Sequence, residues 1–406
     1  MTEQRYDVVI VGGGPAGLAM ALALTRFVDD VKVALLDRRA FSVPRDQRAF
    51  AIAAGVRRVF EQLGVWQGMA GAASPVKQMK ITDSGRGDIS RPQFLSFAGD
   101  VAPGEPFAHL VPNMAMQAAL LEALQDRVEF ITPVEIDMLT PGRLGLKDGR
   151  TIVAPLIIAS DGGQSTLRGL AGIETYFHDY RQSGIVTTIG HELDHQGTAY
   201  EHFRPNGPFA SLPLLDADGR GLRSSLVWTE TAAEAARIKA LPLEAAAAEV
   251  EAAMGSVLGA VTLHEAPQAF PLTLRIARSF VGPRLALIGD AAHVVHPIAG
   301  QGLNLGLKDV AALAEVVVEA LRLGLDHGAD DVLARYQRWR RLDTSLMALV
   351  TDGMNRLFSN DLAPVRAVRD FGLGVVDRLA PVKDALIGRA AGIERGGPRL
   401  LSGLPL

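Results

Sequence analysis

Short β-branched runs alternate with a helical stretch at the start of the chain. Residues 6–11 (YDVVIV) predict a strand, because they form an apolar run that is mostly β-branched. The glycine-rich residues that follow predict a tight turn, and residues 15–27 (PAGLAMALALTRF) have the composition of a helix. Residues 31–36 (VKVALL) predict a second strand, with Asp37 at its end. These segments form a βαβ half-unit, which is typical of an α/β fold.

An excursion interrupts this first pattern. Residues 79–100 are polar and rich in turn-forming residues, so we expect them to leave the first domain. The segments after the excursion predict, in order, a helix (114–124), short strands (128–146) and one buried strand (151–160, TIVAPLIIAS).

The composition changes between about residue 173 and residue 272, where strands and loops alternate. Residues 185–189 and 224–228 are two of the strand patterns, and one alanine-rich helix interrupts them at about 243–254. This pattern is typical of a separate, largely antiparallel sheet. The remaining segments predict a strand (285–288), a long helix (302–323) and, beyond about Asp343, a helical region with breaks at Pro364 and Pro381.

These elements predict an α/β fold in which a Rossmann-like domain is interleaved with a mainly antiparallel-sheet substrate domain, plus C-terminal helices. A chain of 406 residues is too long for one compact core, which agrees with two domains. The predicted ranges are 1–78, 101–172 and 273–345 for the Rossmann-like domain, 79–100 and 173–272 for the substrate domain, and 346–406 for the C-terminal helical region.

Composition and charge exclude several classes of function. The formal net charge of −4 gives no long-range attraction to phosphate backbones, so we expect no nucleic-acid partner. The chain has no cysteine, which excludes disulfides, dithiol redox chemistry and thiolate metal centres and suits the cytosol. The first strand begins too early for a signal peptide, and no apolar run approaches the roughly 18 residues of a spanning helix, so we expect any membrane contact to be peripheral.

The first segment that carries chemistry is Gly12-x-Gly14-x-x-Gly17, between the first strand and the first helix. Glycines permit a tight turn and the close approach of a pyrophosphate, whose charge the helix N-terminus stabilises. Asp37 follows the last glycine at a distance that suits an acceptor for a ribose hydroxyl. The segment therefore predicts a dinucleotide site, although FAD and NAD share this pattern.

The second segment is residues 159–168 (ASDGGQSTLR), at the end of the predicted buried strand. It contains a glycine turn and a polar helix start, and Asp161 stands at the strand end. Taken alone, it is typical of an ordinary turn with an aspartate that caps a helix.

The third segment is residues 284–309 (RLALIGDAAHVVHPIAGQGLNLGLKD). A buried strand ends at Asp290, and Gly300 and Gly302 open a long helix. An acid at a strand end can bind a ribose or ribityl hydroxyl, while a glycine-rich helix start presents free N–H groups and a positive dipole to an anion. The reduced ring of a flavin is such an anion, and stabilising its charge favours reduction.

A metal site is the alternative interpretation of the third segment, because Asp290, His293 and His296 recur every three residues. Pro297 and the loop composition argue against a rigid triad, and no fourth ligand is evident. We therefore expect no metal. The two histidines could satisfy local backbone groups or act in catalysis, and the sequence leaves both interpretations open.

In their order and spacing, the three segments resemble the FAD-binding motifs of flavin monooxygenases that are similar to para-hydroxybenzoate hydroxylase. Within that group, HPIAGQGLNLGLKD resembles the signature of the ubiquinone-biosynthesis hydroxylases. The likeness covers most of the chain. Four further segments are similar to that family: DQRA (46–49), QAALLEAL (117–124), FRPNGPFASLP (203–213) and TDGMNRLFSN (351–360).

The resemblance implies FAD as the cofactor, held by residues from all three segments. These are Gly12, Gly14, Gly17 and Asp37 at the ADP half, Arg48 and Gln117 at the pyrophosphate, Asp161 in the second motif, Asp290 at the ribityl chain, and Pro297, Gly300, Gly302 and Asn304 against the flavin ring. Asp37 departs from the family, where glutamate is frequent, but either carboxylate can accept a hydrogen bond from a ribose hydroxyl.

The function that the resemblance implies is an FAD-dependent monooxygenase. In this family reduced flavin and dioxygen place one oxygen atom on an electron-rich ring, here a polyprenyl phenol intermediate of ubiquinone biosynthesis. The electron donor would be NADPH, NADH or a ferredoxin-type protein, and no second nucleotide fingerprint is visible. Catalytic residues stay unassigned, with His202 and His296 as candidates for a base that accepts the phenol proton.

A polyprenylated substrate lies in a bilayer. The resemblance therefore implies a cytoplasmic protein that is peripheral on the inner face of the membrane or part of a ubiquinone-biosynthesis complex. The tail after Ser345 has 8 Lys and Arg against 6 Asp and Glu, with repeated apolar residues such as Leu349, so it could lie on an anionic membrane. Its helices could equally cover the two domains.

Two other functions stay open on the sequence alone. One is an FAD-dependent isoprenoid reductase or epoxidase of the same fold, and the other is a non-catalytic FAD-bound member of a biosynthetic complex. Transfer of labelled oxygen from dioxygen to an aromatic ring would distinguish a hydroxylase from both.

Overall fold

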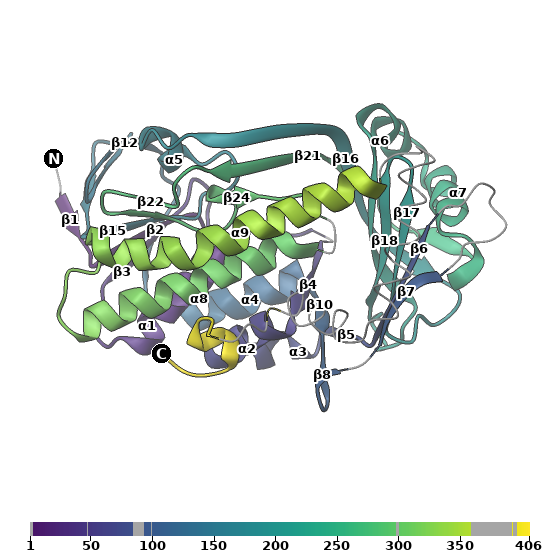
Figure 1. The fold of residues 1–406 in the computed structure, drawn as a ribbon, viewed down its shortest axis with the longest axis horizontal. Helices are drawn as coiled ribbons and strands as arrows, with labels where there is room; N and C mark the ends of the chain where they lie inside the picture. The colour runs from purple at the N-terminus through teal and green to yellow at the C-terminus, as the bar shows by residue number, and fades with distance from the viewer. Residues whose placement is uncertain are drawn as a thin grey trace.

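The computed structural model describes residues 3–46, 48–83, 93–98, 100–297, 300–358, 392 and 396–406. These residues form an α/β lobe, which contains the N-terminus, and a second lobe built on a large sheet (Figure 1). Long strands and one long helix extend from one lobe to the other. The predicted fold class is confirmed.

A six-stranded sheet forms the centre of the α/β lobe. Its strands are, in spatial order, β11 (Glu129–Ile131), β3 (Val33–Leu36), β2 (Val8–Val11), β15 (Leu156–Ala159), β23 (Leu285–Leu287) and β22 (Val281–Gly282). The first five are parallel, and β22 is antiparallel to β23. The central strands are apolar at every position and fully buried, as expected for a parallel sheet covered on both faces.

Helices and a smaller sheet cover this central sheet. The helices α1 (Pro15–Phe27), α4 (Asn113–Leu124) and α8 (Gln301–Arg322) pack side by side and bury their apolar residues in the main core. The smaller sheet consists of β1 (Glu3–Arg5), β14 (Thr151–Val153), β13 (Arg143–Leu146) and β12 (Ile136–Thr140). Its residues Leu144, Leu146 and Ile152 belong to the same core.

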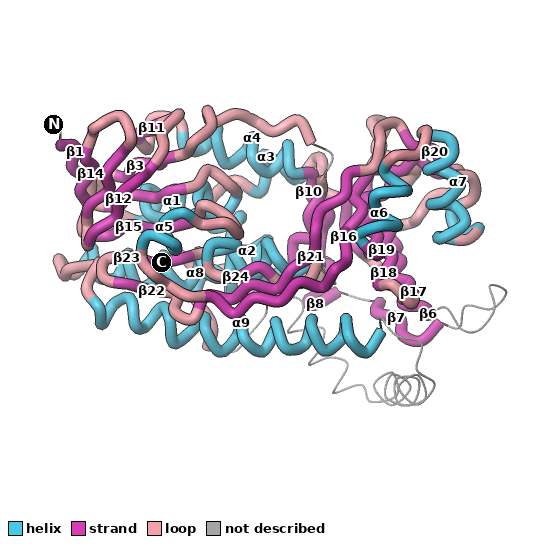
Figure 2. The backbone as a smooth tube through the Cα atoms, turned by 90° about the horizontal axis from the view of Figure 1, so that it is seen from above, coloured by secondary structure: helices cyan, strands magenta, loops and turns pink. Residues whose placement is uncertain are grey.

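The second lobe is built on a nine-stranded sheet within the described residues. Its strands are β24 (His293–Val294), β21 (Gln268–Ala277), β16 (Thr175–His191), β19 (Arg223–Thr231), β18 (Gly207–Leu214), β17 (Thr198–Arg204), β6 (Gln78–Asp83) and β7 (Gln93–Ala98), with β20 (Val261–Leu263) paired to β16. Figure 2 shows β16 and β21 extending from the α/β lobe into this sheet. The two lobes therefore share strands.

The large sheet has an outer and an inner face. Helices α6 (Ala232–Lys239) and α7 (Leu243–Met254) cover the outer face and share a core with Ile185 and Trp228. On the inner face, Ala199 and Leu214 pack against a three-stranded sheet at the junction of the lobes. That sheet consists of β4 (Ala49–Ala53), β10 (Ala108–Pro112) and β5 (Ser74–Val76).

Short elements complete the described fold. They are α2 (Ala54–Gln62), α3 (Trp66–Ala70), α5 (Thr166–Leu170), the hairpin of β8 (Asp100–Ala102) and β9 (Glu105–Pro106), and the 3-10 helices η1 (Ser256–Leu258), η2 (Gly289–Ala291) and η4 (Arg399–Ser402).

The long helix α9 (Asp330–Phe358) packs along α8 and reaches the large sheet at β18 (Figure 1). It is continuous through Asp343, so the helical region begins earlier than the sequence predicted. The predicted breaks at Pro364 and Pro381 lie outside the described residues. Within the part of the chain that is described, no helix is both long and apolar enough to cross a membrane.

One prediction about strands was wrong. Residues 151–160 are not one strand, because Pro155 separates β14 from β15 and the two pair in different sheets. Proline lacks the N–H that a ladder needs, which explains the break. The excursion at 79–100 contributes strands to the large sheet, since β6 pairs with β17 and β7 pairs with β6, while residues 84–92 and 99 lie outside the described residues.

The second lobe also differs in detail from the prediction. Two helices, α6 and α7, interrupt its strands where the sequence predicted one. The pattern at 185–189 is the central part of β16, which is 17 residues long. The predicted boundary between the domains at residue 272 falls inside β21, a strand that extends from one lobe to the other. The predicted domain ranges therefore remain a proposal.

Candidate cofactor and substrate site

Three chemically informative segments meet at one edge of the six-stranded sheet. Gly12 follows β2, Ser160 follows β15, and Gly289 follows β23, and these three strands are neighbours and parallel. Adjacent strands lie about 4.8 Å apart. The carboxyl ends of parallel strands are where α/β sheets bind ligands.

Close packing explains two of the three glycines in the first segment. Gly12 has a φ of +113°, and a Cβ at Gly17 would lie 2.0 Å from the carbonyl oxygen of Gly12. The Ser160 hydroxyl donates a 2.9 Å hydrogen bond to that same carbonyl, which ties the first segment to the second. Gly14 differs, because a Cβ there would meet no atom within 4 Å. Space is therefore open at the N-terminus of α1.

Asp37 lies beside this glycine turn. Its Oδ2 accepts a 2.7 Å hydrogen bond from the N–H of Gly13, and its Oδ1 accepts one of 2.9 Å from the N–H of Arg39. The carboxylate therefore fixes the turn, and the remaining lone pairs of its oxygens can accept from a ligand hydroxyl.

Asp161 has two roles available to it. Its Oδ2 accepts hydrogen bonds from the N–H groups of Thr166 and Leu167 at 2.7 and 3.2 Å, so it caps α5. Its Oδ1 is buried and has no hydrogen-bond partner within the described ranges. A buried acceptor without a partner suits a donor from a bound molecule.

Arg168 joins the second and third segments and was not predicted as a site residue. Its buried guanidinium donates to the carbonyl of Ala291 at 2.7 Å and to that of Gly163 at 2.8 Å. These contacts place the turn after β15 against the turn after β23.

Asp290 lies in the turn that follows β23. Its side chain is exposed to solvent, yet the surrounding protein raises its pKa, while His293 and Arg48 act in the opposite direction. Behind it, Gly289 packs against α1 and α8, since a Cβ at Gly289 would lie 3.4 Å from the Cβ of Ala16. The acid therefore lies where the three segments converge.

Arg48 and Gln117 belong to one hydrogen-bonded group. Arg48 donates to Asp46 at 2.8 Å, Asn113 donates to the same Asp46 carboxylate at 2.9 Å, and Gln117 donates to Asn113 at 3.2 Å. Sequence reasoning missed Asp46 and Asn113 as site residues, because Asn113 at the start of α4 reaches Asp46 and Arg48 from more than 60 residues away in the sequence.

The start of α8 faces the same region. Gly300 has a φ of +63°, and its N–H donates to the carbonyl of Pro297 at 2.9 Å. A Cβ at Gly302 would meet no atom within 4 Å. Asn304 instead bonds to β4, accepting from the N–H of Ala53 and donating to the carbonyl of Ala51. Its amide therefore holds the helix start in place.

A buried charged network supports the third segment. Asp309 on α8 accepts from the N–H of Gly289 at 2.9 Å, from His293 at 2.6 Å and from Arg340 on α9 at 2.7 Å. Burial acts to raise the pKa of Asp309, but His293 and Arg340 outweigh it and hold the pKa below its ordinary value. Asp309 is therefore ionised and fixes the turn that carries Asp290.

No group of three or more metal-ligating side chains is found in the described part of the chain. Two of the residues considered for a metal have other environments: His293 is hydrogen-bonded to Asp309, and Asp290 is exposed to solvent.

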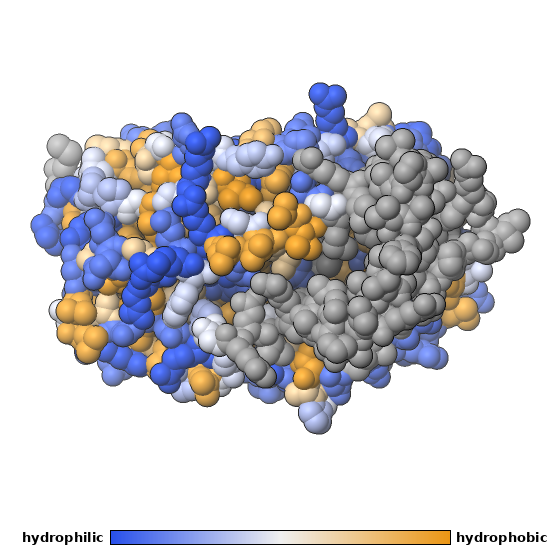
Figure 3. All heavy atoms as spheres, in the orientation of Figure 1, coloured by the Kyte–Doolittle hydropathy of each residue, from blue (hydrophilic) through white to orange (hydrophobic). Residues whose placement is uncertain are grey.

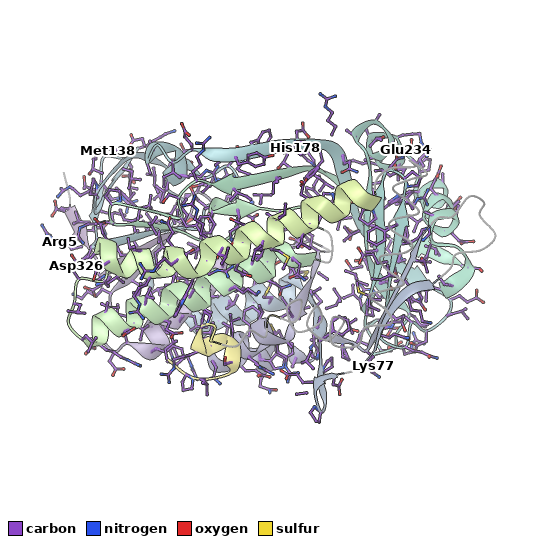
Figure 4. The ribbon with its side chains drawn as sticks, in the orientation of Figure 1. Arg5, Lys77, Met138, His178, Glu234 and Asp326 are labelled. Carbon is purple, nitrogen blue, oxygen red and sulfur yellow. The ribbon has the colours of Figure 1, made fainter. Side chains whose placement is uncertain are left out.

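The two histidine candidates lie in different places. His296 is fully buried within the third segment and packs edge-on against Tyr180 of β16, with ring centroids 5.0 Å apart. Burial lowers its pKa to about 4, so it is neutral at pH 7. Figure 4 labels His178, which packs against Tyr180 from the same strand. His202 lies on the outer face of the large sheet, within 2.8 Å of the hydroxyl of Thr82.

Comparison with known proteins gives matches over nearly the whole chain. Residues 5–345 match the FAD binding domain family. The chain is 40% identical to the ubiquinone hydroxylase UbiL of Rhodospirillum rubrum, across 100% of this chain and 94% of that protein. It is 34% identical to the 3-demethoxyubiquinol 3-hydroxylase of Escherichia coli, across 97% of this chain and 100% of that protein.

Solved structures share the fold at lower identity. The p-nitrophenol 4-monooxygenase PnpA of Pseudomonas putida superposes with a TM-score of 0.77 and 19% identity, covering 96% of this chain and 99% of that one. PqsL of Pseudomonas aeruginosa superposes with a TM-score of 0.71 and 20% identity, covering 94% and 100%. At such identities the likeness shows the fold.

Proposed function

Because this chain belongs to the FAD-binding family that includes the ubiquinone-biosynthesis hydroxylases, we propose that it hydroxylates the aromatic ring of a polyprenyl phenol intermediate in ubiquinone biosynthesis. FAD is its cofactor and dioxygen its co-substrate. The observation that carries this proposal is the meeting of three sequence segments at the carboxyl edge of β2, β15 and β23.

The residues at this edge fit an FAD molecule. The open space at Gly14 and Gly302 lies at the N-terminal ends of α1 and α8, where free N–H groups favour a pyrophosphate and a negatively charged ring. The unpartnered oxygen of Asp161 and the exposed carboxyl of Asp290 can accept hydrogen bonds from hydroxyls of the cofactor.

We assign the cofactor contacts as follows. Gly12, Gly14, Gly17 and Asp37 hold the ADP half, Arg48 and Gln117 the pyrophosphate, Asp161 and Asp290 the linker, and Pro297, Gly300 and Gly302 the ring. Asn304 acts through its bonds to β4, so we assign it to positioning the helix start.

The chemistry that FAD supplies when bound is the activation of dioxygen for transfer of one oxygen atom to the ring. The protein must orient the phenol and exclude water. The inner face of the large sheet and β4 provide apolar walls for this purpose, since Ala51, Ala199 and Leu212 pack in one cluster there.

A polyprenyl chain on the proposed substrate would reside in a bilayer, which favours a location of the protein at a membrane. We propose a cytoplasmic enzyme that is peripheral on the inner face of the membrane, alone or within a biosynthetic complex. Support comes from α9, on which Leu342, Leu349 and Val350 are more than half exposed. Figure 3 shows apolar atoms gathered along the course of this helix. The electron donor, NADPH, NADH or a ferredoxin-type protein, is not assigned.

The test uses FAD-loaded protein, chemically reduced and then exposed to ¹⁸O-labelled dioxygen with a geranyl-substituted phenol. We expect one labelled oxygen atom on the aromatic ring, measured by mass spectrometry. A product reduced or epoxidised in the geranyl chain would show the alternative isoprenoid chemistry. Unchanged phenol would support a non-catalytic FAD protein.

A second test uses a bacterial strain without its ubiquinone hydroxylases that carries this gene. We expect lipid extracts to lose the accumulated quinone precursor. The identity of that precursor would also name the ring position that is hydroxylated.

A further inference from the structure

Glu201 is an acidic residue on a face of β17 whose other side chains are apolar. Side chains of a strand alternate between its two faces, so Ala199, Glu201 and Phe203 of β17 share one face. Ala199 packs with Leu110 and Leu214 in the cluster at the junction of the lobes, which identifies this face as the inner one. Glu201 therefore points toward the α/β lobe.

The other residues of β17 confirm this assignment of its two faces. Tyr200 packs against the core shared with α6 and α7, and His202 pairs with Thr82. Both residues are on the outer face, away from β4 and the start of α8.

The inner face is connected to the cofactor edge through β4. Ala51 belongs to the same apolar cluster as Ala199, and a Cβ at Gly300 would lie 3.3 Å from the Cβ of Ala51. Asn304 donates to the carbonyl of Ala51 at 2.8 Å. Ala51 of β4 therefore lies between the inner face of β17, which carries Glu201, and the start of α8, which is assigned to the flavin ring.

Nothing in the described part of the chain compensates the Glu201 carboxyl. The residue is 4% exposed, and no hydrogen bond or ion pair reaches its side chain from the described residues. Burial is the cause that raises its pKa to about 7. A buried carboxyl without a partner lowers stability, and such a group calls for an explanation.

Among the described residues, the elements packed around Glu201 place no other charge against it. Its cross-strand neighbours are Ile81 on β6 and Ala210 on β18. Lys80 on β6 lies over the ring of Tyr200 on the outer face, and His109 on β10 packs against Trp66. On α9, Asp352 accepts from the hydroxyl of Tyr180.

We propose that Glu201 binds the ring hydroxyl of the phenol substrate and accepts its proton. This proposal rests on the proposed hydroxylase function. The O–H bond of the phenol breaks, a new O–H bond forms on the carboxylate, and the electron pair stays on the phenol oxygen. The ring becomes more electron-rich, which favours its attack on an electrophilic oxygen. No further reactant is required for this step.

The experiment compares Glu201→Gln with wild-type protein, both loaded with FAD and chemically reduced before oxygen is added. The probes are a geranyl-substituted phenol and a geranyl-substituted methoxyphenol. We expect Glu201→Gln to lower the hydroxylation rate about 100-fold. Affinity for the probe should change about tenfold or less, the effect of one lost hydrogen bond. Glu201→Asp, which keeps a carboxylate, should recover part of the rate.

The pH profile separates proton transfer from a structural role. The wild-type rate should rise with pH through about 7, where Glu201 loses its proton, and this rise should be absent in Glu201→Gln. The control is Tyr200→Phe, on the same strand but on the outer face, which should keep the wild-type profile.

The outcomes distinguish this inference from the function on which it rests. Absence of hydroxylated product from wild-type protein with either probe would overturn the hydroxylase function. Product from wild-type protein together with an unchanged rate and profile in Glu201→Gln would overturn the role of Glu201 alone. So would loss of the pH dependence in His202→Gln but not in Glu201→Gln.

Discussion

Gly14 and Gly17 lie one helical turn apart and are glycine for different reasons. Gly17 needs to lack a side chain because a Cβ there would collide with the carbonyl of Gly12. Gly14 has free space around it and a φ of −76°, a backbone conformation that alanine adopts readily. The fold therefore places no steric requirement for glycine at Gly14, and we attribute the glycine there to the proposed pyrophosphate site.

This difference predicts opposite phenotypes for two matched substitutions. Gly14→Ala should keep the melting temperature of the FAD-free protein and lose most of its bound FAD, because the methyl group occupies the approach of the pyrophosphate. Gly17→Ala should lower both the melting temperature and the FAD content. Thermal unfolding and the flavin absorbance of the purified variants measure these effects. A Gly14→Ala protein with full flavin occupancy would contradict the assigned phosphate site.

The buried carboxyl of Glu201 makes stability depend on pH. Its pKa is about 7 in the folded protein and 4.5 without burial, so the folded state binds more protons between these values. Stability is therefore lost as pH rises through this window and is lowest above pH 7. The full shift corresponds to about 3 kcal/mol.

Glu201→Gln should remove this dependence. We expect the free energy of unfolding of the variant, relative to that of wild type, to increase by about 2 to 3 kcal/mol from pH 5 to pH 8. Urea unfolding of both proteins at both pH values measures this change. All other groups titrate alike in the two proteins, so their difference isolates Glu201. An equal difference at the two pH values would mean that the carboxyl has a partner in solution.

At the scale of elements, α8, α9 and the end of β23 are joined by one carboxylate. Asp309 receives hydrogen bonds from Gly289, His293 and Arg340, and all three partners are fixed by separate elements. Removing one member of a buried charged group leaves another charge uncompensated. The network therefore couples the position of α9 to the turn that carries Asp290.

Asp309→Asn should lower the free energy of unfolding by about 3 kcal/mol or more and weaken FAD retention. Urea unfolding and FAD titration of the variant test both effects. The matched control is Asp326→Asn, which breaks an exposed pair with Arg284 and should cost about 1 kcal/mol or less. Equal losses for the two variants would show that the buried network has no special role.

Elements could be predicted from the sequence where one local signal dominates. The βαβ start was predicted correctly because β2 and α1 are apolar at nearly every position and have a glycine turn between them. The run at 151–160 was misread because a proline inside an apolar stretch gives no information about which sheets its two halves join. The length of β16 was missed because its first residues are polar and exposed in the ribbon between the lobes.

The site residues could likewise be predicted where a local sequence signal marks them. The glycines and acids at strand ends were visible in the sequence, and the structure brings Gly12, Asp161 and Asp290 to one edge. Arg168 and Asp309 were missed because their partners lie on other elements. Glu201 carried a signal that was not used, since an acid stands between Ala199 and Phe203 at period-two spacing.

At the scale of the whole molecule, β16, β21 and α9 extend through both lobes (Figures 1 and 2). Two lobes that share strands cannot move as freely as two domains joined by a linker. The hydrogen bond from Tyr180 on β16 to Asp352 on α9, 3.1 Å long, adds a further connection. If the proposed lipid-borne substrate enters between these joined lobes, the proposed membrane contact requires that entrance to face the membrane.

The exposed apolar residues of α9 test that orientation. Leu342 and Leu349 are 67% and 68% exposed and lie two helical turns apart on one side of the helix. Burying one leucine is worth roughly 2 kcal/mol, so Leu342→Glu combined with Leu349→Glu should reduce binding to anionic phospholipid vesicles more than about 100-fold. Vesicle flotation of the FAD-loaded protein measures this partition.

The control for this prediction replaces two exposed leucines on other elements, Leu170 and Leu193, with glutamate. It adds the same charge, so electrostatic repulsion from the anionic lipid is matched and the remaining difference reports burial of α9. Hydroxylation of a detergent-dispersed phenol should be unchanged in both double variants, because none of these four residues is assigned to the cofactor or the substrate. If the control pair weakens vesicle binding as strongly as the α9 pair, the membrane contact of α9 is wrong and added charge alone explains the loss.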